Sequence, residues 1–134
     1  MTEEFKRKVN ELSLMEAQAQ YMEKQLESIN ANINEIEIAK SAIEELRKTK
    51  EEVLVPIGAG VSIRMKTVDT EKILVRVGAG VVVEKDVEDW MKEIDKKKEE
   101  LIKIAEKIQL ELERFAEIFR EKQAEVRALA EKQR

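Results

Sequence analysis

The stretch LVPIGAGVSI at residues 54–63 recurs at residues 74–83 as LVRVGAGVVV, and the two copies hold all four glycines of the chain and its one proline. Around each GAG triplet, apolar residues alternate with their neighbours, and a period of two is typical of β-strands. Glycine permits the positive φ angles that a tight hairpin turn needs. The duplication therefore predicts two β-hairpins in tandem within residues 52–85. The predicted turn residues are Gly58, Gly60, Gly78 and Gly80.

A glycine-rich triplet can also cradle a phosphate group. Neither copy matches GxGxxG or GxxxxGKS/T, however, and neither opens directly into a helix. We therefore expect hairpin turns at both sites. Pro56 lacks a backbone N–H, so its strand is expected at the edge of a sheet.

The segments on either side of the hairpins lack glycine and proline and carry apolar residues at helical spacing. In residues 3–50, alternate steps of three and four reach ten apolar residues among thirteen positions, which indicates the seam of a coiled coil. These positions are Phe5, Lys8, Leu12, Met15, Ala19, Met22, Leu26, Ile29, Ile33, Ile36, Lys40, Ile43 and Arg47. Such a helix would reach roughly 70 Å, too long for a compact domain of this size.

Residues 86–132 predict a second long helix, with Asp86 as its N-cap. Its predicted seam begins Val87, Trp90, Ile94, Lys97, Leu101, Ile104, Ile108. It is then expected to shift by one residue, which would locally change the supercoil. After the shift it continues through Ala105, Ile108, Leu112, Phe115, Phe119, Lys122, Val126 and Leu129. We interpret Trp90 as a packing residue.

The two helices are similar in length, and the hairpin segment is their only connection. Folding back at that segment would pair them as an antiparallel coiled-coil hairpin, which loop-closure entropy favours. The alternative is that each helix pairs with helices of other chains. The expected fold is mainly α with a small β part, as a single domain over residues 1–134.

Composition excludes several classes of function. Charged residues make up 40% of the 134 residues and aromatic residues only 4%, as in coiled coils. Cysteine and histidine are absent, so disulfides, thiolate or imidazole metal ligands and histidine acid–base catalysis are excluded. Acidic and basic residues are interspersed at a net charge of −4, which does not suggest a nucleic-acid partner. We expect no enzyme activity, no cofactor and no metal, because the carboxylates lie among lysines on helical faces.

No apolar run is long enough for a secretory signal or a membrane span. The sequence therefore predicts a cytoplasmic protein without a membrane partner.

The strands carry more apolar side chains than a hairpin can cover. An isolated two-stranded hairpin is marginal in water, and open strand edges invite pairing with other chains. We therefore predict an intersubunit β-barrel or sandwich. The predicted oligomerisation residues are Val53, Val55, Ile57, Val61, Ile63, Ile73, Val75, Val77, Val81 and Val83.

A helix, then VLVPIGAGVSI at 53–63, then ILVRVGAGVVVEK at 73–85, then a second helix resembles the α class of the archaeal prefoldin family. The hairpin motifs are the specific part of this resemblance, and the flanking heptads are generic. The resemblance implies an ATP-independent chaperone of two α and four β subunits on a double β-barrel platform. It also implies that unfolded client proteins are held at the coiled-coil tips and passed to a group II chaperonin.

In an antiparallel hairpin the tips carry the residues nearest both termini. The expected client-binding residues are Phe5, Val9, Leu12, Leu14, Met15, Phe119, Val126 and Leu129. Val9 and Leu14 lie off the predicted seam, so apolar surface is expected there. Ordinary seam packing is the alternative interpretation of Leu12, Met15, Val126 and Leu129.

Two points stay open at this stage. The sequence ends in RALAEKQR, which is short and charged. How much of the client binding this subunit supplies is therefore open. A structural coiled-coil spacer or filament former, assembled through the same hairpins and without clients, is the alternative function.

Overall fold

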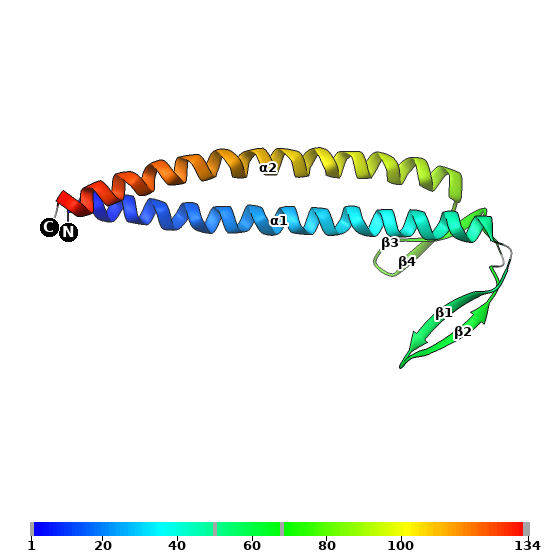
Figure 1. The fold of residues 1–134 in the computed structure, drawn as a ribbon. Coiled ribbons are helices and arrows are strands. Elements are labelled where there is room, and N and C mark those ends of the chain that lie inside the picture. The colour runs from blue at the N-terminus through cyan, green and yellow to red at the C-terminus, as the bar shows by residue number, and fades with distance from the viewer. Residues whose placement is uncertain (1, 50, 68, 133–134) are drawn as a thin grey trace. The chain divides into compact units, whose positions relative to one another are not determined.

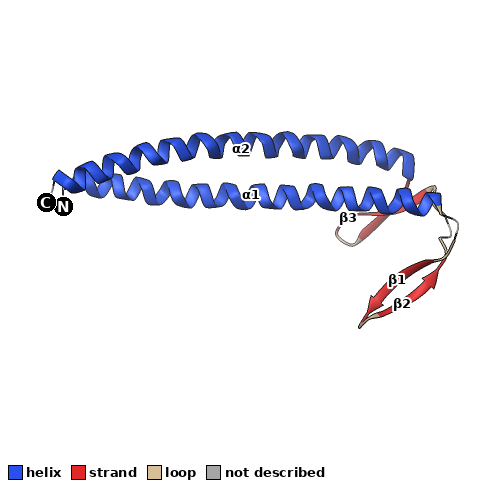
Figure 2. Ribbon diagram, viewed as in Figure 1, coloured by secondary structure: helices blue, strands red, loops and turns tan. Residues whose placement is uncertain are grey.

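The computed structural model describes residues 2–49, 51–67 and 69–132. Its elements run in the order α1 (Glu3–Lys48), β1 (Val53–Gly58), β2 (Val61–Met65), β3 (Lys72–Gly78), β4 (Val81–Asp86) and α2 (Val87–Lys132) (Figure 1). Two long helices with two small antiparallel hairpins between them confirm the predicted fold class (Figure 2). Lys50, at the predicted end of the first helix, and Val68, between the predicted hairpins, lie outside the described residues.

The chain divides into two compact units. The first unit comprises Met1–Asn32 and Glu100–Arg134, and the second comprises Ile33–Glu99. Each unit therefore contains one part of α1 and one part of α2, and the second also contains both hairpins.

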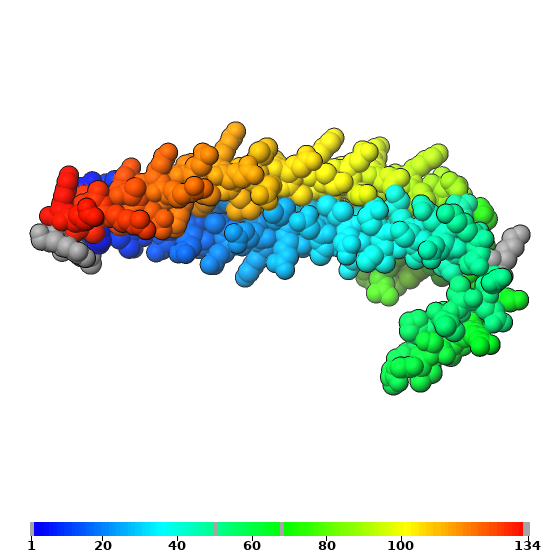
Figure 3. All heavy atoms as spheres, viewed as in Figure 1, coloured from blue at the N-terminus to red at the C-terminus, as the bar shows by residue number. Residues whose placement is uncertain are grey.

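Ion pairs between the helices show their orientation in the first unit. The Lys8 ammonium contacts the Glu125 carboxylate at 2.7 Å, and that of Lys122 contacts Glu11 at 2.9 Å. A rise of three residues along α1 is thus matched by a fall of three along α2, so the two helices are antiparallel. In the space-filling view these parts of α1 and α2 lie in side-by-side contact (Figure 3).

The second unit shows the same orientation independently. Lys98 pairs with Glu37, and Lys40 pairs with Asp95. Residue numbers again rise along α1 while they fall along α2. In each unit the helices of one chain therefore pair with each other, as the preferred interpretation of the sequence expected.

The seam of α1 lies where the heptads place it. All thirteen predicted seam positions are buried or half-buried, and Met22 is the most covered of them. The cationic members carry ion partners: Lys8 and Lys40 pair with α2, and Arg47 contacts Glu71 and Glu88.

The predicted one-residue shift in the α2 seam is wrong. One unbroken heptad register of buried or half-buried positions runs along α2: Val87, Met91, Ile94, Lys98, Leu101, Ala105, Ile108, Leu112, Phe115, Phe119, Lys122, Val126 and Leu129. Lys97 is exposed, and Ile104 is 46% exposed. Ile104 is apolar and fits a heptad counted from Trp90, but the adjacent Ala105 and the aliphatic stem of Lys98 occupy the seam instead.

Each hairpin forms its own two-stranded antiparallel sheet. In the first, the turn consists of Ala59 and Gly60, whose φ angles are 52° and 78°. Positive φ at both central positions defines a type I′ turn, which matches the right-handed twist of the strands. The strand register shifts between Pro56 and Gly58, so Ile57 is a bulge residue without a cross-strand partner.

The second hairpin repeats this geometry. Ala79 and Gly80 form its turn with φ angles of 48° and 76°, and the register shifts between Arg76 and Gly78. An alanine with positive φ is uncommon, and the duplicated GAG triplet places one in both turns. Here Val77 is the bulge residue.

Val87 anchors the start of α2. Its side chain is fully buried, and its backbone N–H donates a 2.8 Å hydrogen bond to the carbonyl oxygen of Glu71. Asp86 precedes it directly at the N-cap position. This contact ties the chain before β3 to the first turn of α2.

Candidate functional site

The first hairpin has one apolar face. Val53 pairs with Met65 and Val55 with Ile63, and cross-strand partners point to the same face of a sheet. These two pairs are two residues apart along each strand, so they share that face. Leu54 and Arg64 pair on the opposite face, which is therefore mixed.

The second hairpin has a similar arrangement, except that a lysine interrupts its apolar face. Val75 pairs with Val83, and Ile73 pairs with Lys85, whose ammonium contacts Glu93 at 2.8 Å. The other face carries Leu74, which is 74% exposed.

Most predicted oligomerisation residues are exposed in the single chain. Only Val53, Ile73 and Val75 are half-buried. The exposed members are Val55, Ile57, Val61, Ile63, Val77, Val81 and Val83. Among the described residues each sheet has two strands, so each hairpin also leaves both edges open. Apolar faces with open strand edges allow strands of another chain to pair with the hairpin.

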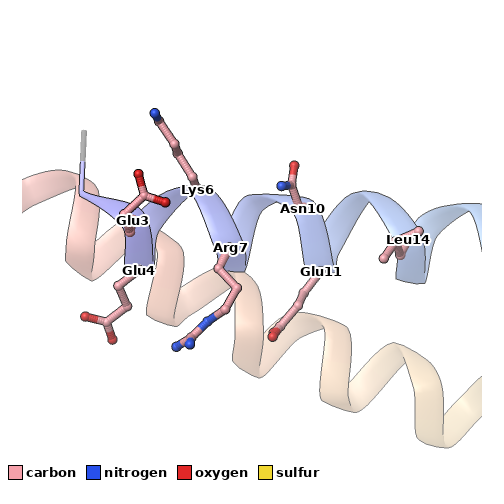
Figure 4. A pocket seen from close by; sticks show the side chains of 7 residues that line it. All are labelled: Glu3, Glu4, Lys6, Arg7, Asn10, Glu11 and Leu14. Carbon is pink, nitrogen blue, oxygen red and sulfur yellow. The ribbon is translucent and has the colours of Figure 1, made fainter.

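Leu14 is the most exposed of the predicted client-binding residues. Its side chain is 72% exposed, at one end of a shallow surface hollow along α1 (Figure 4). The other residues that line this hollow are Glu3, Glu4, Lys6, Arg7, Asn10 and Glu11. An apolar side chain thus lies beside charges of both signs.

Val9 is 38% exposed, and the remaining predicted client-binding residues are half-buried. Those remaining residues are Phe5, Leu12, Met15, Phe119, Val126 and Leu129. They occupy seam positions, so the helix pairing itself covers part of each side chain.

An apolar groove in the first unit was not predicted. It is lined by Glu16, Ala19, Glu23, Leu112, Phe115, Ala116, Phe119 and Arg120. Alanines contributed by both helices leave room beside two phenylalanine rings, and the rim is charged. Of these residues, only Phe119 was expected to contact clients. The signal in the sequence was the small Ala19 within an otherwise bulky seam.

Val9 lies on the same flank of α1 as this apolar groove. Glu16 and Glu23 form the α1 rim, and Val9 precedes Glu16 by one heptad. The first unit therefore presents Val9 and the groove on one flank, while Leu14 lies outside the seam on another.

The ion pairs of the first unit shift the acid–base behaviour of their members. The hydrogen bond between Lys8 and Glu125 raises the pKa of Lys8 above its ordinary value and lowers the pKa of Glu125. The hydrogen bond from Lys122 likewise lowers the pKa of Glu11. Lys8, Glu11 and Glu125 are therefore charged at neutral pH.

The described part of the chain lacks two kinds of feature. No helix there is long and apolar enough to cross a membrane. Residues 2–49, 51–67 and 69–132 also hold no group of three or more acidic side chains placed to bind a metal ion.

The order of elements and the paired GAG hairpins can be compared with known proteins. The family model for prefoldin subunits matches residues 15–132, which include both hairpins and most of both helices. The chain belongs to the prefoldin family. It is therefore a chaperone subunit, and its hairpins and helices are prefoldin elements.

Several curated prefoldin relatives are archaeal α subunits. The prefoldin subunit alpha of Methanococcus aeolicus is 31% identical over 128 residues, which cover 94% of this chain and 87% of the relative. That of Pyrococcus horikoshii is 32% identical over 120 residues, covering 84% of this chain and 81% of the relative. These matches confirm the resemblance that the hairpin motifs indicated.

A solved prefoldin structure shares the fold. It is the cryo-EM structure of filamentous PFD from Methanocaldococcus jannaschii, with a TM-score of 0.70 and 22% sequence identity. The match covers 87% of this chain and 98% of the other.

Proposed function

We propose that this chain is the α-class subunit of an ATP-independent chaperone that holds unfolded client proteins on the apolar surface of its first unit. The observation that carries this proposal is the apolar groove beside Phe115 and Phe119, with Val9 exposed on the same flank. Unfolded chains expose apolar side chains that a folded protein buries. A groove with an apolar floor would bind such side chains without requiring a particular amino-acid sequence in the client.

The surroundings of the groove suit weak, reversible contact with many clients. Glu16 and Glu23 line one rim and Arg120 lies on the other, so the floor is bordered by hydrated charges. Charged rims limit the apolar patch and disfavour permanent aggregation with the client. Met15, a half-buried seam residue in the same unit, has the flexible side chain that promiscuous binding surfaces favour.

The hairpins would supply assembly. We propose that their apolar faces and open edges join β-class prefoldin subunits, two α with four β, in an intersubunit β-barrel. Support comes from the exposure of seven of the ten predicted oligomerisation residues in the single chain. Each hairpin can pair with the strands of a different subunit. Two hairpins would therefore join one subunit to a neighbour on either side in a closed platform.

We further propose that bound clients pass to a group II chaperonin in the cytoplasm. Release would need no nucleotide, because competition for the same apolar client segments suffices to transfer them. Neither GAG triplet has the spacing of a nucleotide-binding loop.

The Ala116→Glu substitution tests the client-binding proposal. Ala116 is exposed and lines the groove, so a glutamate would place a charge over the apolar floor without filling the seam. Ala124→Glu is the matched control, because Ala124 is an alanine of the same helix that does not line the groove. Complexes of equal mass should be compared for suppression of aggregation of a chemically unfolded model enzyme.

We expect the Ala116→Glu complex to need several-fold more protein for half-maximal suppression, and the Ala124→Glu complex to match the parent. Equal protection by both variants would contradict client binding at the groove.

One observation favours a second function. The solved structure that shares this fold is described as filamentous, and open strand edges also permit end-to-end growth. On this alternative the chain is a spacer or filament former without clients. Sedimentation of the pure subunit, alone and with a β-class prefoldin subunit, distinguishes the two: long polymers and no mixed complex would favour the filament.

A further inference from the structure

Lysines interrupt the apolar seam of both helices. In the first unit, Lys8 of α1 contacts Glu125 of α2, and Lys122 of α2 contacts Glu11 of α1. Each helix thus contributes a lysine in the seam and, three residues further on, a glutamate on its flank. The side chains of Lys8 and Lys122 are 25% and 37% exposed, so the helix pairing covers most of each lysine, and the carboxylate of the other helix compensates its charge.

The second unit contains a corresponding set with the charges in the opposite order. Glu37 precedes Lys40 on α1, and Asp95 precedes Lys98 on α2. Lys98 pairs with Glu37, and Lys40 pairs with Asp95. Each of these four seam lysines therefore has a carboxylate of the other helix beside it.

We propose that these four seam lysines select the helix partner: they allow antiparallel pairing of α1 with α2 and oppose pairing of either helix with the same helix of another copy. The apolar part of the seam does not discriminate in this way, because both helices present mainly large apolar side chains at the same heptad positions. Polar seam residues and flanking charges are the usual determinants of partner and orientation in coiled coils.

Pairing of two α1 helices leaves the seam lysines without acidic partners on the other helix. In the antiparallel register that overlaps their seams most fully, Phe5 faces Ile43, and Lys8 of one copy faces Lys40 of the other. The flanking positions that Glu125 and Asp95 occupy in the native pairing are then taken by Ala39 and Val9. The two lysines would then repel each other, and neither would have a carboxylate of the other helix beside it. Parallel pairing would place each lysine against the same lysine of the other copy, so the like charges would again repel each other.

Two α2 helices fail for the same reason. Overlapping their seams in antiparallel fashion brings Lys98 of one copy against Lys122 of the other. The flanking positions beside these lysines are then taken by Gln123 and Lys97, so the cluster is cationic. Only α1 against α2 places an acid of the other helix beside every one of the four lysines.

Partner selection matters wherever several copies are held together. Subunits joined through their hairpins bring many similar helices to a high local concentration, where exchange of partners would tie separate subunits to each other. Like-charge contacts in the wrong pairings would keep each helix pair within its own chain. This inference does not depend on client binding, and a chain that holds no client would still show it.

A charge swap with a cross-linking reporter tests the selection in the full chain. The chain has no cysteine, so Gln25→Cys introduces a single thiol on α1. In the α1–α1 register described above, Gln25 of one copy lies beside Gln25 of the other, so a disulfide dimer reports that pairing. Lys8→Glu replaces the lysine–lysine contact by an attraction to Lys40 of the other copy and sets two carboxylates against each other in the native pairing, the new one and that of Glu125.

Two further variants isolate the seam contact. Lys24→Glu makes the same change of charge at an exposed position of α1. Adding Glu125→Lys to Lys8→Glu restores an opposite-charge pair with α2. At low ionic strength we expect Lys8→Glu to raise the disulfide-dimer fraction several-fold over the Gln25→Cys parent, with Lys24→Glu at the parent level and the double swap returning toward it. High salt should reduce these differences.

Equal dimer fractions in Lys8→Glu and Lys24→Glu would overturn the proposal. If Lys8→Glu lowers the helical circular dichroism signal instead, the double swap must restore that signal, and failure to do so would also overturn it.

Discussion

Replacing Val87 by alanine tests how the hairpins and α2 are joined. Val87 is the one side chain that the structure buries completely among the described residues, at the junction of β4 and α2. Removing two buried methyl groups loses about 1.6 kcal/mol of transfer free energy. The residual cavity adds about 1 kcal/mol, and the better helix propensity of alanine returns about 0.5 kcal/mol. We therefore expect the free energy of unfolding to fall by about 2 kcal/mol.

Val82→Ala is the matched control for this prediction. Val82 lies on β4 and is 51% exposed, so its truncation creates no cavity and should cost less than about 1 kcal/mol. Urea unfolding followed by circular dichroism at 222 nm, at one protein concentration, compares the two variants. A loss for Val87→Ala no greater than that for Val82→Ala would refute the role of Val87 as the anchor of this junction.

Two further predictions concern the turn and the ion pairs. Gly58 has a φ of 127°, and no atom lies within 4 Å of the place that an alanine methyl would take, so Gly58→Ala should cost about 1–3 kcal/mol through the backbone alone. Amide exchange in β1 and β2 should then rise by roughly 5- to 150-fold, while exchange in the second hairpin stays unchanged; equal changes in both hairpins would contradict it. The lowered pKa values of Glu11 and Glu125 mean that their pairs stabilise the fold above the ordinary glutamate pKa and are lost as pH falls through the lowered values. The thermal midpoint should therefore drop more steeply below about pH 4.3 in the parent than in E11Q/E125Q, and parallel curves would contradict this.

The helices and hairpins could be predicted because local patterns determine them. The heptads of α1 identify its covered positions, and the alternation around each GAG triplet identifies the strands. Ile104 misled the prediction for α2, because an apolar residue next to the seam resembles a seam residue. Which of Ile104 and Ala105 occupies the seam depends on how α2 packs against its partner helix.

The candidate site was predictable only in part. The positions of Val9 and Leu14 off the α1 seam indicated their exposure, which one helix suffices to predict. The apolar groove depends on Ala19 and Ala116 coming together from opposite helices, and a sequence does not give that register directly. The bulge at Ile57 also depends on cross-strand pairing.

The partners of the seam lysines illustrate the same limit. Lys8 and Lys40 were identified as polar members of an apolar seam, but their acids lie on α2, far away in sequence. Their identification required the orientation and register of the helix pair.

Site-specific photo-cross-linking tests the central claim most directly. A photoreactive residue at Val9, in the first unit, should be compared with one at Ile38, in the second unit, in complexes mixed with an unfolded client. Ile38 is 60% exposed and Val9 only 38%, so exposure alone would favour Ile38. We predict cross-links to the client from position 9 and few from position 38. Equal cross-linking, or more from position 38, would contradict client binding by the first unit.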